Sequence, residues 1–155
     1  MAKFIAPCNR VIGTGANDTI GSYVNDVGAV APRRLKLYHW AFGFSTTPAD
    51  AAIVLRGRLC TDEGTNTDVV PRPVDPADLT SVCDAGENHT VVPTAIAAEP
   101  FLEVGIHQRA CPIFWYAPPD GDIVAPAAAG DGFSIDTPVI SSGTPTGYFN
   151  FHVAE

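Results

Sequence analysis

Two apolar runs on either side of a polar turn dominate the middle of the chain. In the first run, Arg34–Phe44, apolar side chains occupy both alternating sets of positions. Because successive side chains of a strand point to opposite faces, both faces of this strand are apolar. We therefore expect it inside a two-sheet sandwich or against a neighbouring subunit. The two sets are Tyr38, Trp40, Phe42 and Phe44 on one face and Leu35, Leu37, Ala41 and Gly43 on the other.

Alternation elsewhere predicts further strands. The run Ala51–Cys60, after the turn Ser45–Asp50, has one apolar and one polar face, and Gly147–Val153 alternates throughout. No sustained helical periodicity is present. We predict an all-β fold of about eight antiparallel strands, most simply a jelly-roll-like β-sandwich. The other predicted strands are Asp18–Val24 (bulged or broken at Gly21), Phe101–His107, Ile113–Tyr116, Asp122–Pro126 and Gly132–Thr137.

Two segments show little alternation. Residues 1–17 predict an N-terminal arm followed by a turn, and residues 61–100 predict a long proline-rich excursion. Within the excursion, Val74–Leu79 predicts a short helix, because Asp75 can cap free N–H groups and Pro76 suits the first helical position. The rest of the excursion is too polar for a core strand. It could pack on the outside of its own sandwich or on a neighbouring chain.

Composition narrows the possible partners. The 155 residues suit a single domain, 46% of them are hydrophobic, and the net charge is −8. An acidic surface lacks the Lys and Arg that nucleic acid and anionic membranes require, so we expect neither partner. The chain has no apolar run of transmembrane length, and its beginning lacks the apolar core of a secretory signal. We therefore expect synthesis in the cytosol.

The sequence contains no recognisable catalytic or metal-binding motif. The histidines show no HExxH or similar spacing, and no GxSxG motif marks a nucleophile. The cysteines show no CxxC, so they predict small buried side chains, although a disulfide formed after release from the cell stays open. We predict no catalytic residue, no cofactor and no metal. The residues concerned are His39, His89, His107, His152, Cys8, Cys60, Cys83 and Cys111.

Several stretches together resemble a family of small virion proteins of tailed bacteriophages. The most specific part is PRPVDPAD at 71–78 followed by GENHT at 86–90. The resemblance spans most of the chain, but Cys8, Cys83 and Cys111 depart from the family pattern, which leaves disulfide use open. The other matching stretches are MAKFIAP, GTGANDTI, Arg33–Phe44, FSTTPADAAI, Leu59–Thr61, IHQRACPIFWYAPPDGDIVAPA and FHVAE.

This resemblance implies a virion structural protein, most simply a decoration or cement protein on the capsid exterior that binds the major capsid protein. Synthesis would then take place in the host cytoplasm. A homotrimer is expected, because closed cyclic symmetry suits sites where capsid subunits meet in threes. The resemblance carries over no functional residues. From the residues themselves we select as a candidate interface Tyr38, Trp40, Phe42, Arg72, Asp75, Leu79, Trp115 and Tyr116.

Two other classes of function stay open. A receptor- or glycan-binding head fibre or tail module would present aromatic rings such as those of Trp115 and Tyr116 in a groove. Core or interface packing is the simpler interpretation of these aromatics. A hydrolase on a β-sandwich would need a nucleophile in contact with a base, and such a pair does not show in the order of the sequence.

Overall fold

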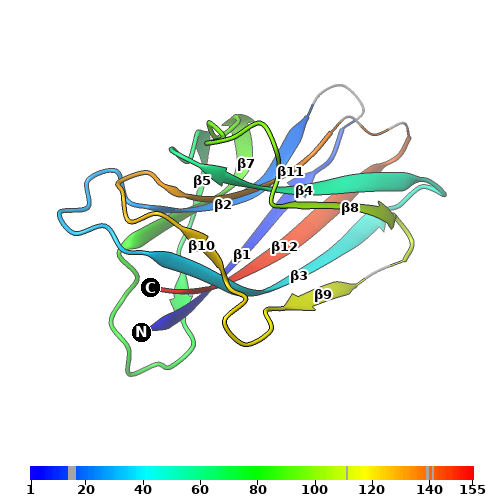
Figure 1. The fold of residues 1–155 in the computed structure, drawn as a ribbon. Helices are drawn as coiled ribbons and strands as arrows, with labels where there is room; N and C mark the ends of the chain where they lie inside the picture. Colours follow the sequence, from blue (N-terminus) through cyan, green and yellow to red (C-terminus); the bar gives the residue numbers. More distant parts are fainter. Residues whose placement is uncertain (14–16, 111, 139, 141) are drawn as a thin grey trace.

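The structure is a computed structural model that describes residues 1–13, 17–110, 112–138, 140 and 142–155. These described residues form twelve strands and no helix. The strands make two six-stranded antiparallel sheets that face each other across the core (Figure 1). The predicted all-β class is confirmed. Within the described part of the chain, no helix has the length and apolarity that crossing a membrane requires.

Sheet A has the strand order β10-β3-β12-β1-β6. β9 also pairs with β3, on the same side as β10 and further along the strand. Sheet B has the strand order β5-β7-β2-β11-β4-β8. The strands of sheet A are β1 (Lys3–Val11), β3 (Leu35–Thr47), β6 (Arg72–Pro73), β9 (Ile113–Tyr116), β10 (Ile123–Ala125) and β12 (Thr144–Ala154). Those of sheet B are β2 (Asp18–Asn25), β4 (Ala52–Cys60), β5 (Thr65–Val69), β7 (Cys83–Val91), β8 (Leu102–His107) and β11 (Gly132–Thr137).

Aromatic side chains fill the space between the sheets. Each of these strands turns alternate side chains inward, so the two inner faces together bury an apolar layer. Phe149 packs against Phe151 with 4.7 Å between ring centroids, and Tyr23 of sheet B lies 6.1 Å from Phe151. The largest fully buried side chains are Tyr23, Phe4, Phe42, Phe133, Phe149 and Phe151.

A bulge in β3 changes which of its residues face the core. The register of β3 against β12 shifts after His152, which pairs with His39, while Val153 pairs with Leu37. The extra residue, Tyr38, lies at the bulge, so inward positions are odd-numbered before it and even-numbered after it. Tyr38 therefore does not share a face with Trp40, contrary to the simple alternation. The sequence did not predict the bulge, because nothing in the alternation of apolar and polar residues around Tyr38 marks it.

The N-terminal segment is a strand, which corrects the predicted arm. Residues 3–11 form β1, which pairs with β12 along its whole length. Phe4, Ala6 and Cys8 point into the core. On its other side β1 pairs with β6 only at Phe4 and Ile5, so Pro7 stands on a free stretch of edge, where proline is tolerated.

The proline-rich segment 61–100 also contains strands, which corrects the second expectation. Besides β5 and β6 it contributes β7, which lies inside sheet B between β5 and β2. β7 has polar residues, but its inward positions are small, such as Cys83 and Ala85, and its buried His89 contacts Ser22. β1, β5, β6 and β7 are the four strands beyond the eight that alternation predicted.

The short helix expected at Val74–Leu79 is a turn. The Asp75 carboxylate accepts a hydrogen bond from the Ala77 N–H at 2.9 Å, as a cap would. The Asp78 N–H then donates to the Asp75 carbonyl at 3.0 Å, and no helical turn follows. The segment is exposed and has no apolar face to bury, so nothing stabilises a helix there. We call residues 74–82, between β6 and β7, the β6–β7 loop.

Candidate functional site

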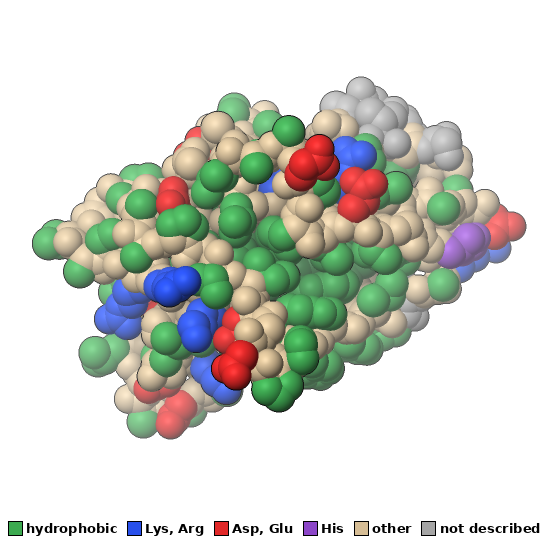
Figure 2. Space-filling view, viewed as in Figure 1, with side chains coloured by type: hydrophobic (Ala, Val, Ile, Leu, Met, Phe, Trp, Pro, Cys, Tyr) green, Lys and Arg blue, Asp and Glu red, His purple; other side chains and the backbone are tan. Residues whose placement is uncertain are grey.

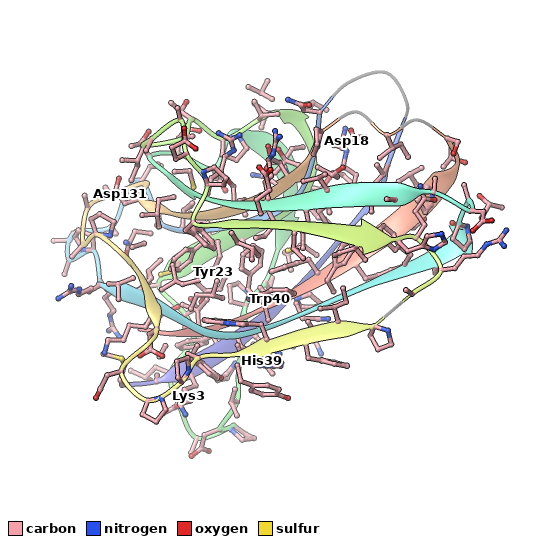
Figure 3. All side chains as sticks on the ribbon, turned by 45° about the vertical axis from the view of Figure 1, so that its right-hand side comes forward. Lys3, Asp18, Tyr23, His39, Trp40 and Asp131 are labelled. Carbon is pink, nitrogen blue, oxygen red and sulfur yellow. The ribbon has the colours of Figure 1, made fainter. Side chains whose placement is uncertain are left out.

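The outer face of sheet A carries a row of side chains that crosses five strands. Cross-strand partners share a face, so the register places Tyr116 beside His39, His39 beside His152, His152 beside Ile5 and Ile5 beside Arg72. We call these five residues the outer row. Figure 3 shows His39 toward the outer side of sheet A, whereas Trp40 lies between the sheets.

The rings of the outer row are in contact. Tyr116 stacks on His39 with 4.0 Å between centroids and an interplanar angle of 4°. His39 in turn lies 4.0 Å from the ring of His152, and Tyr38 meets the same ring edge-on at 6.1 Å. The Lys3 ammonium lies 4.9 Å from the centre of the Tyr38 ring. Side-chain contacts therefore connect the four strands β9, β3, β12 and β1.

The two imidazoles at the centre of this row are neutral at physiological pH. Burial lowers the pKa of His39. Burial and the neighbouring His39 lower the pKa of His152 to about 4. The Nε2 atom of His39 is shielded from solvent and has no hydrogen-bond partner. The centre of the face therefore presents aromatic surface without charge.

Further apolar surface adjoins the outer row. Phe114 of β9 is 57% exposed and Tyr116 is 68% exposed, while Tyr148 of β12 lies on the same face and is also exposed. Ala41 and Gly43 of β3 pair with Phe114 and with Tyr148, respectively, and leave the surface flat between the rings. An uncharged aromatic surface of this kind is typical of sites that another protein covers.

The β6–β7 loop lies at the other end of the same sheet. The Val74 N–H donates to the Lys3 carbonyl at 2.8 Å, which ties the start of the loop to β1. Leu79 is 86% exposed, and Val74 is also exposed. Seven of the fourteen exposed large hydrophobic side chains among the described residues belong to the segment 61–100, which is about a quarter of the chain. The segment therefore offers more apolar surface than its length predicts.

A buried carboxylate holds the end of this loop. Glu155 accepts hydrogen bonds from the Tyr23 hydroxyl at 2.7 Å and from the Ser81 hydroxyl on the same oxygen. Burial and the Glu155 carboxylate raise the pKa of Tyr23 above its ordinary range, so the phenol keeps its proton and donates. This contact fixes Ser81 against the core and leaves residues 75–80 outside.

One buried pair has the residue types of a hydrolase. The Nε2 atom of His89 lies 3.0 Å from the Ser22 hydroxyl. Ser22 has no exposed surface and His89 has 2%. Burial, then Arg10, lower the pKa of His89 to about 4, and its Nδ1 has no hydrogen-bond partner. A substrate cannot reach this serine, so the pair stabilises the packing of β2 against β7 and forms no open site.

The remaining candidate chemistry is equally enclosed. Cys8, Cys60 and Cys83 are free and buried, and Cys111 lies outside the described residues. Burial raises the pKa of each of the three thiols, that of Cys60 to about 12. They are therefore unreactive thiols at neutral pH. Among the described residues, no three His, Cys, Asp or Glu side chains lie together as a metal site would require.

The structure separates the eight residues chosen from the sequence into three places. Tyr38, Tyr116 and Arg72 lie on the outer face of sheet A, and Asp75 and Leu79 lie exposed in the β6–β7 loop. Trp40 and Phe42 are core residues, with 3% and 1% of their surface exposed, so they have no surface to offer a partner. Trp115 points inward and lies parallel to Trp40, with 6.4 Å between centroids.

Sequence reasoning missed His39, His152 and Phe114 as members of the site. Alternation in β9 already places Phe114 on the same face as Tyr116, so this residue could have been found. The contact of the two histidines depends on the pairing of β3 with β12 across more than a hundred residues of sequence, and on the bulge at Tyr38. No local pattern encodes that register.

Comparisons of the chain with protein families, with curated proteins and with solved structures found no match.

Proposed function

We propose that this chain is a virion structural protein that decorates the exterior of a phage capsid and binds the major capsid protein. The observation that carries the proposal is the uncharged aromatic surface at the centre of sheet A, formed by Tyr116, His39 and His152 of the outer row with Phe114 and Tyr148, while Arg72 lies at its margin. Such a surface can be covered by another protein without the cost of removing charges from water. The resemblance to phage virion proteins supplies the identity of the partner.

The topology supports this proposal through a jelly-roll interpretation. If β5, β6 and β7 are treated as an insertion and β9 with β10 as one interrupted strand, eight strands remain. Their orders are β1-β12-β3-β9/β10 in sheet A and β2-β11-β4-β8 in sheet B. We propose that this is a jelly-roll β-sandwich, an architecture that viral capsid and lectin domains share. The fold alone does not imply the function.

The test is binding of the purified protein to particles of the phage that encodes it. Replacing Phe114 and Tyr116 together by Ser removes the most exposed rings of the face, so we expect co-sedimentation with particles to fall at least tenfold. A Val27→Ser variant serves as control, because Val27 is an exposed apolar residue of the β2–β3 loop, away from this face. Equal binding of the double variant and the control would refute the proposal.

The segment 61–100 is the second contact that we propose with the capsid or with a neighbouring copy. A deletion of Val69–Asp84 is unsuitable for testing this idea, because it would cut β5 and β7 and remove β6. Replacement of residues 75–80 alone spares these strands. A single chain does not test the homotrimer expected from the sequence, and the two-fold pairing inferred below is the alternative to it.

A receptor- or glycan-binding module is the second candidate function. It is favoured by the adjacent exposed rings of Phe114 and Tyr116, since sugars stack on such rings. Trp115 faces inward and is not part of that platform. Glycan-array binding that is lost with Phe114 and Tyr116 both replaced by Ala, and is kept with Trp115→Ala, would support this function. Absence of any glycan signal would argue against it.

A further inference from the structure

The edge of sheet B at β8 differs from the other sheet edges among the described residues. Natural proteins protect edge strands by shortness, proline, bulges or charge. β6 has two residues and contains Pro73, and β9 and β10 have four and three residues. β5 is irregular in its pairing with β7. β8 has six residues, contains no proline or lysine, and pairs with β4 without a register shift. It is the longest and most regular of these edges, and unlike the free stretch of β1, which contains Pro7, it has no proline.

The apolar side of β8 is incompletely covered. Leu102, Val104 and Ile106 pair with inward positions of β4, yet Leu102 and Val104 are only half-buried. On the facing edge of sheet A, the inward side chains of Ile113 and Trp115 are half-buried as well. Figure 2 shows a hollow lined by hydrophobic side chains between β8 and the edge formed by β9 and β10. Core side chains are thus open to solvent along this seam.

We propose that two copies of this chain pair through β8, in antiparallel register about a two-fold axis at Gly105. In this register Val104 of each copy lies opposite Ile106 of the other, which continues the apolar inner face. Glu103 lies opposite His107 on the outer face, and Gly105 meets Gly105. A two-fold contact is self-complementary, so the Val104–Ile106 and Glu103–His107 pairs each occur twice, while the Gly105 pair lies on the axis and occurs once.

The charges along the edge fit this register. Within one copy, the Glu103 carboxylate lies 2.9 Å from the Arg56 guanidinium, and the His107 imidazole lies 3.0 Å from the Asp50 carboxylate. Pairing about Gly105 therefore places Arg56 and Glu103 of one copy next to His107 and Asp50 of the other on the outer face. In this series the two carboxylates alternate with the guanidinium and the imidazole. Pairing about Glu103 instead would place two like carboxylates opposite each other, which is unfavourable.

Gly105 provides a direct test. A Cβ added to Gly105 meets no atom within 4 Å, so a cysteine fits there without disturbing the fold. At a two-fold axis, paired residues of antiparallel strands have Cα atoms about 4.5–5.5 Å apart, within the range that a disulfide spans. The described native cysteines Cys8, Cys60 and Cys83 are buried and should not interfere.

We expect Gly105→Cys to oxidise to a covalent dimer of twice 16.3 kDa, and light scattering of the unmodified protein to give the same dimer mass in solution. Thr67→Cys, on the exposed edge strand β5, is the control and should form no covalent dimer. Failure of Gly105→Cys to cross-link, equal cross-linking of the control, or a trimer mass for the unmodified protein would each overturn the proposal.

A second pair of variants separates edge pairing from folding. Val104→Lys places a charge on the inner side of the edge and should convert the dimer to a monomer with an unchanged circular dichroism spectrum. Val11→Lys makes the same change at an exposed position of β1 and should leave the dimer intact. A dimer that persists in Val104→Lys would show that β8 is not the contact, whatever the capsid-binding result.

Discussion

His39 and His152 are two imidazoles in contact on the outer face of sheet A, and their protonation makes the stability of the folded protein depend on pH. Both have a folded-state pKa below that of an ordinary histidine, and His152 has a pKa of about 4. Between that value and about 6.5 the unfolded chain binds more protons than the folded protein. The stability that these two histidines contribute is therefore full above about pH 7 and is lost as the pH falls toward 4.

Replacing His152 by Phe should reduce this acid sensitivity, because the ring contact with His39 is kept and one suppressed protonation is removed. We expect the fall in melting temperature between pH 7 and pH 5 to be clearly smaller in His152→Phe than in the unmodified protein. Phe114→Leu, an uncharged change on the same face, should retain the full fall. His89 contributes a slope of the same sign in all three proteins. Identical slopes in all three would contradict the account.

Glu155 is the second residue whose role can be measured alone. Its carboxylate accepts from both Tyr23 and Ser81, and Tyr23 is fully buried. Glu155→Ala leaves a buried hydroxyl without an acceptor, which should cost about 1–3 kcal/mol of unfolding free energy in urea titrations. In a Tyr23→Phe background the same change should cost less. Additive effects of the two substitutions would mean that the hydrogen bond contributes nothing.

At the scale of elements, the sequence predicted best where one strand could be identified from its own alternation. Ile113–Tyr116 and Gly132–Thr137 have the predicted limits, and the last strand turns Phe149, Phe151 and Val153 inward as expected. The sequence did not predict β7, because its inward side chains are small or polar and so produce no alternating apolar pattern. The outer row was only partly predictable, since Tyr116 and Arg72, at its two ends, lie on one face only through the pairing of five strands.

The β6–β7 loop makes the clearest prediction for an element. Replacing residues 75–80 by a glycine-serine segment of equal length should change stability by less than about 1 kcal/mol, because the removed side chains are exposed. Binding to phage particles should fall at least tenfold if the loop is a contact. A matched replacement of residues 27–31, a loop that also carries exposed valines, should bind normally. Equal binding by both loop variants would remove the loop from the interface.

For the molecule as a whole, the common core predicts that the two sheets unfold together. Phe133 of sheet B and Phe149 of sheet A belong to one buried cluster, and neither has exposed surface. Replacing either by Ala should therefore destabilise both sheets, by about 3–5 kcal/mol. The two tryptophans, Trp40 and Trp115, belong to sheet A and point into the core, so their fluorescence reports on that sheet and on its packing against sheet B.

This arrangement gives a test of cooperativity with the reporter and the substitution in different sheets. Phe133→Ala should lower the urea midpoint measured by tryptophan fluorescence as much as the midpoint measured by far-ultraviolet circular dichroism. The two curves should also keep the slope of the unmodified protein, which marks a single transition. A fluorescence midpoint that stays in place while the dichroism midpoint falls would mean that sheet A is stable without sheet B. The aromatic face and the β8 edge would then belong to separately folding parts, whereas the contacts proposed for the two surfaces need them held on one rigid body.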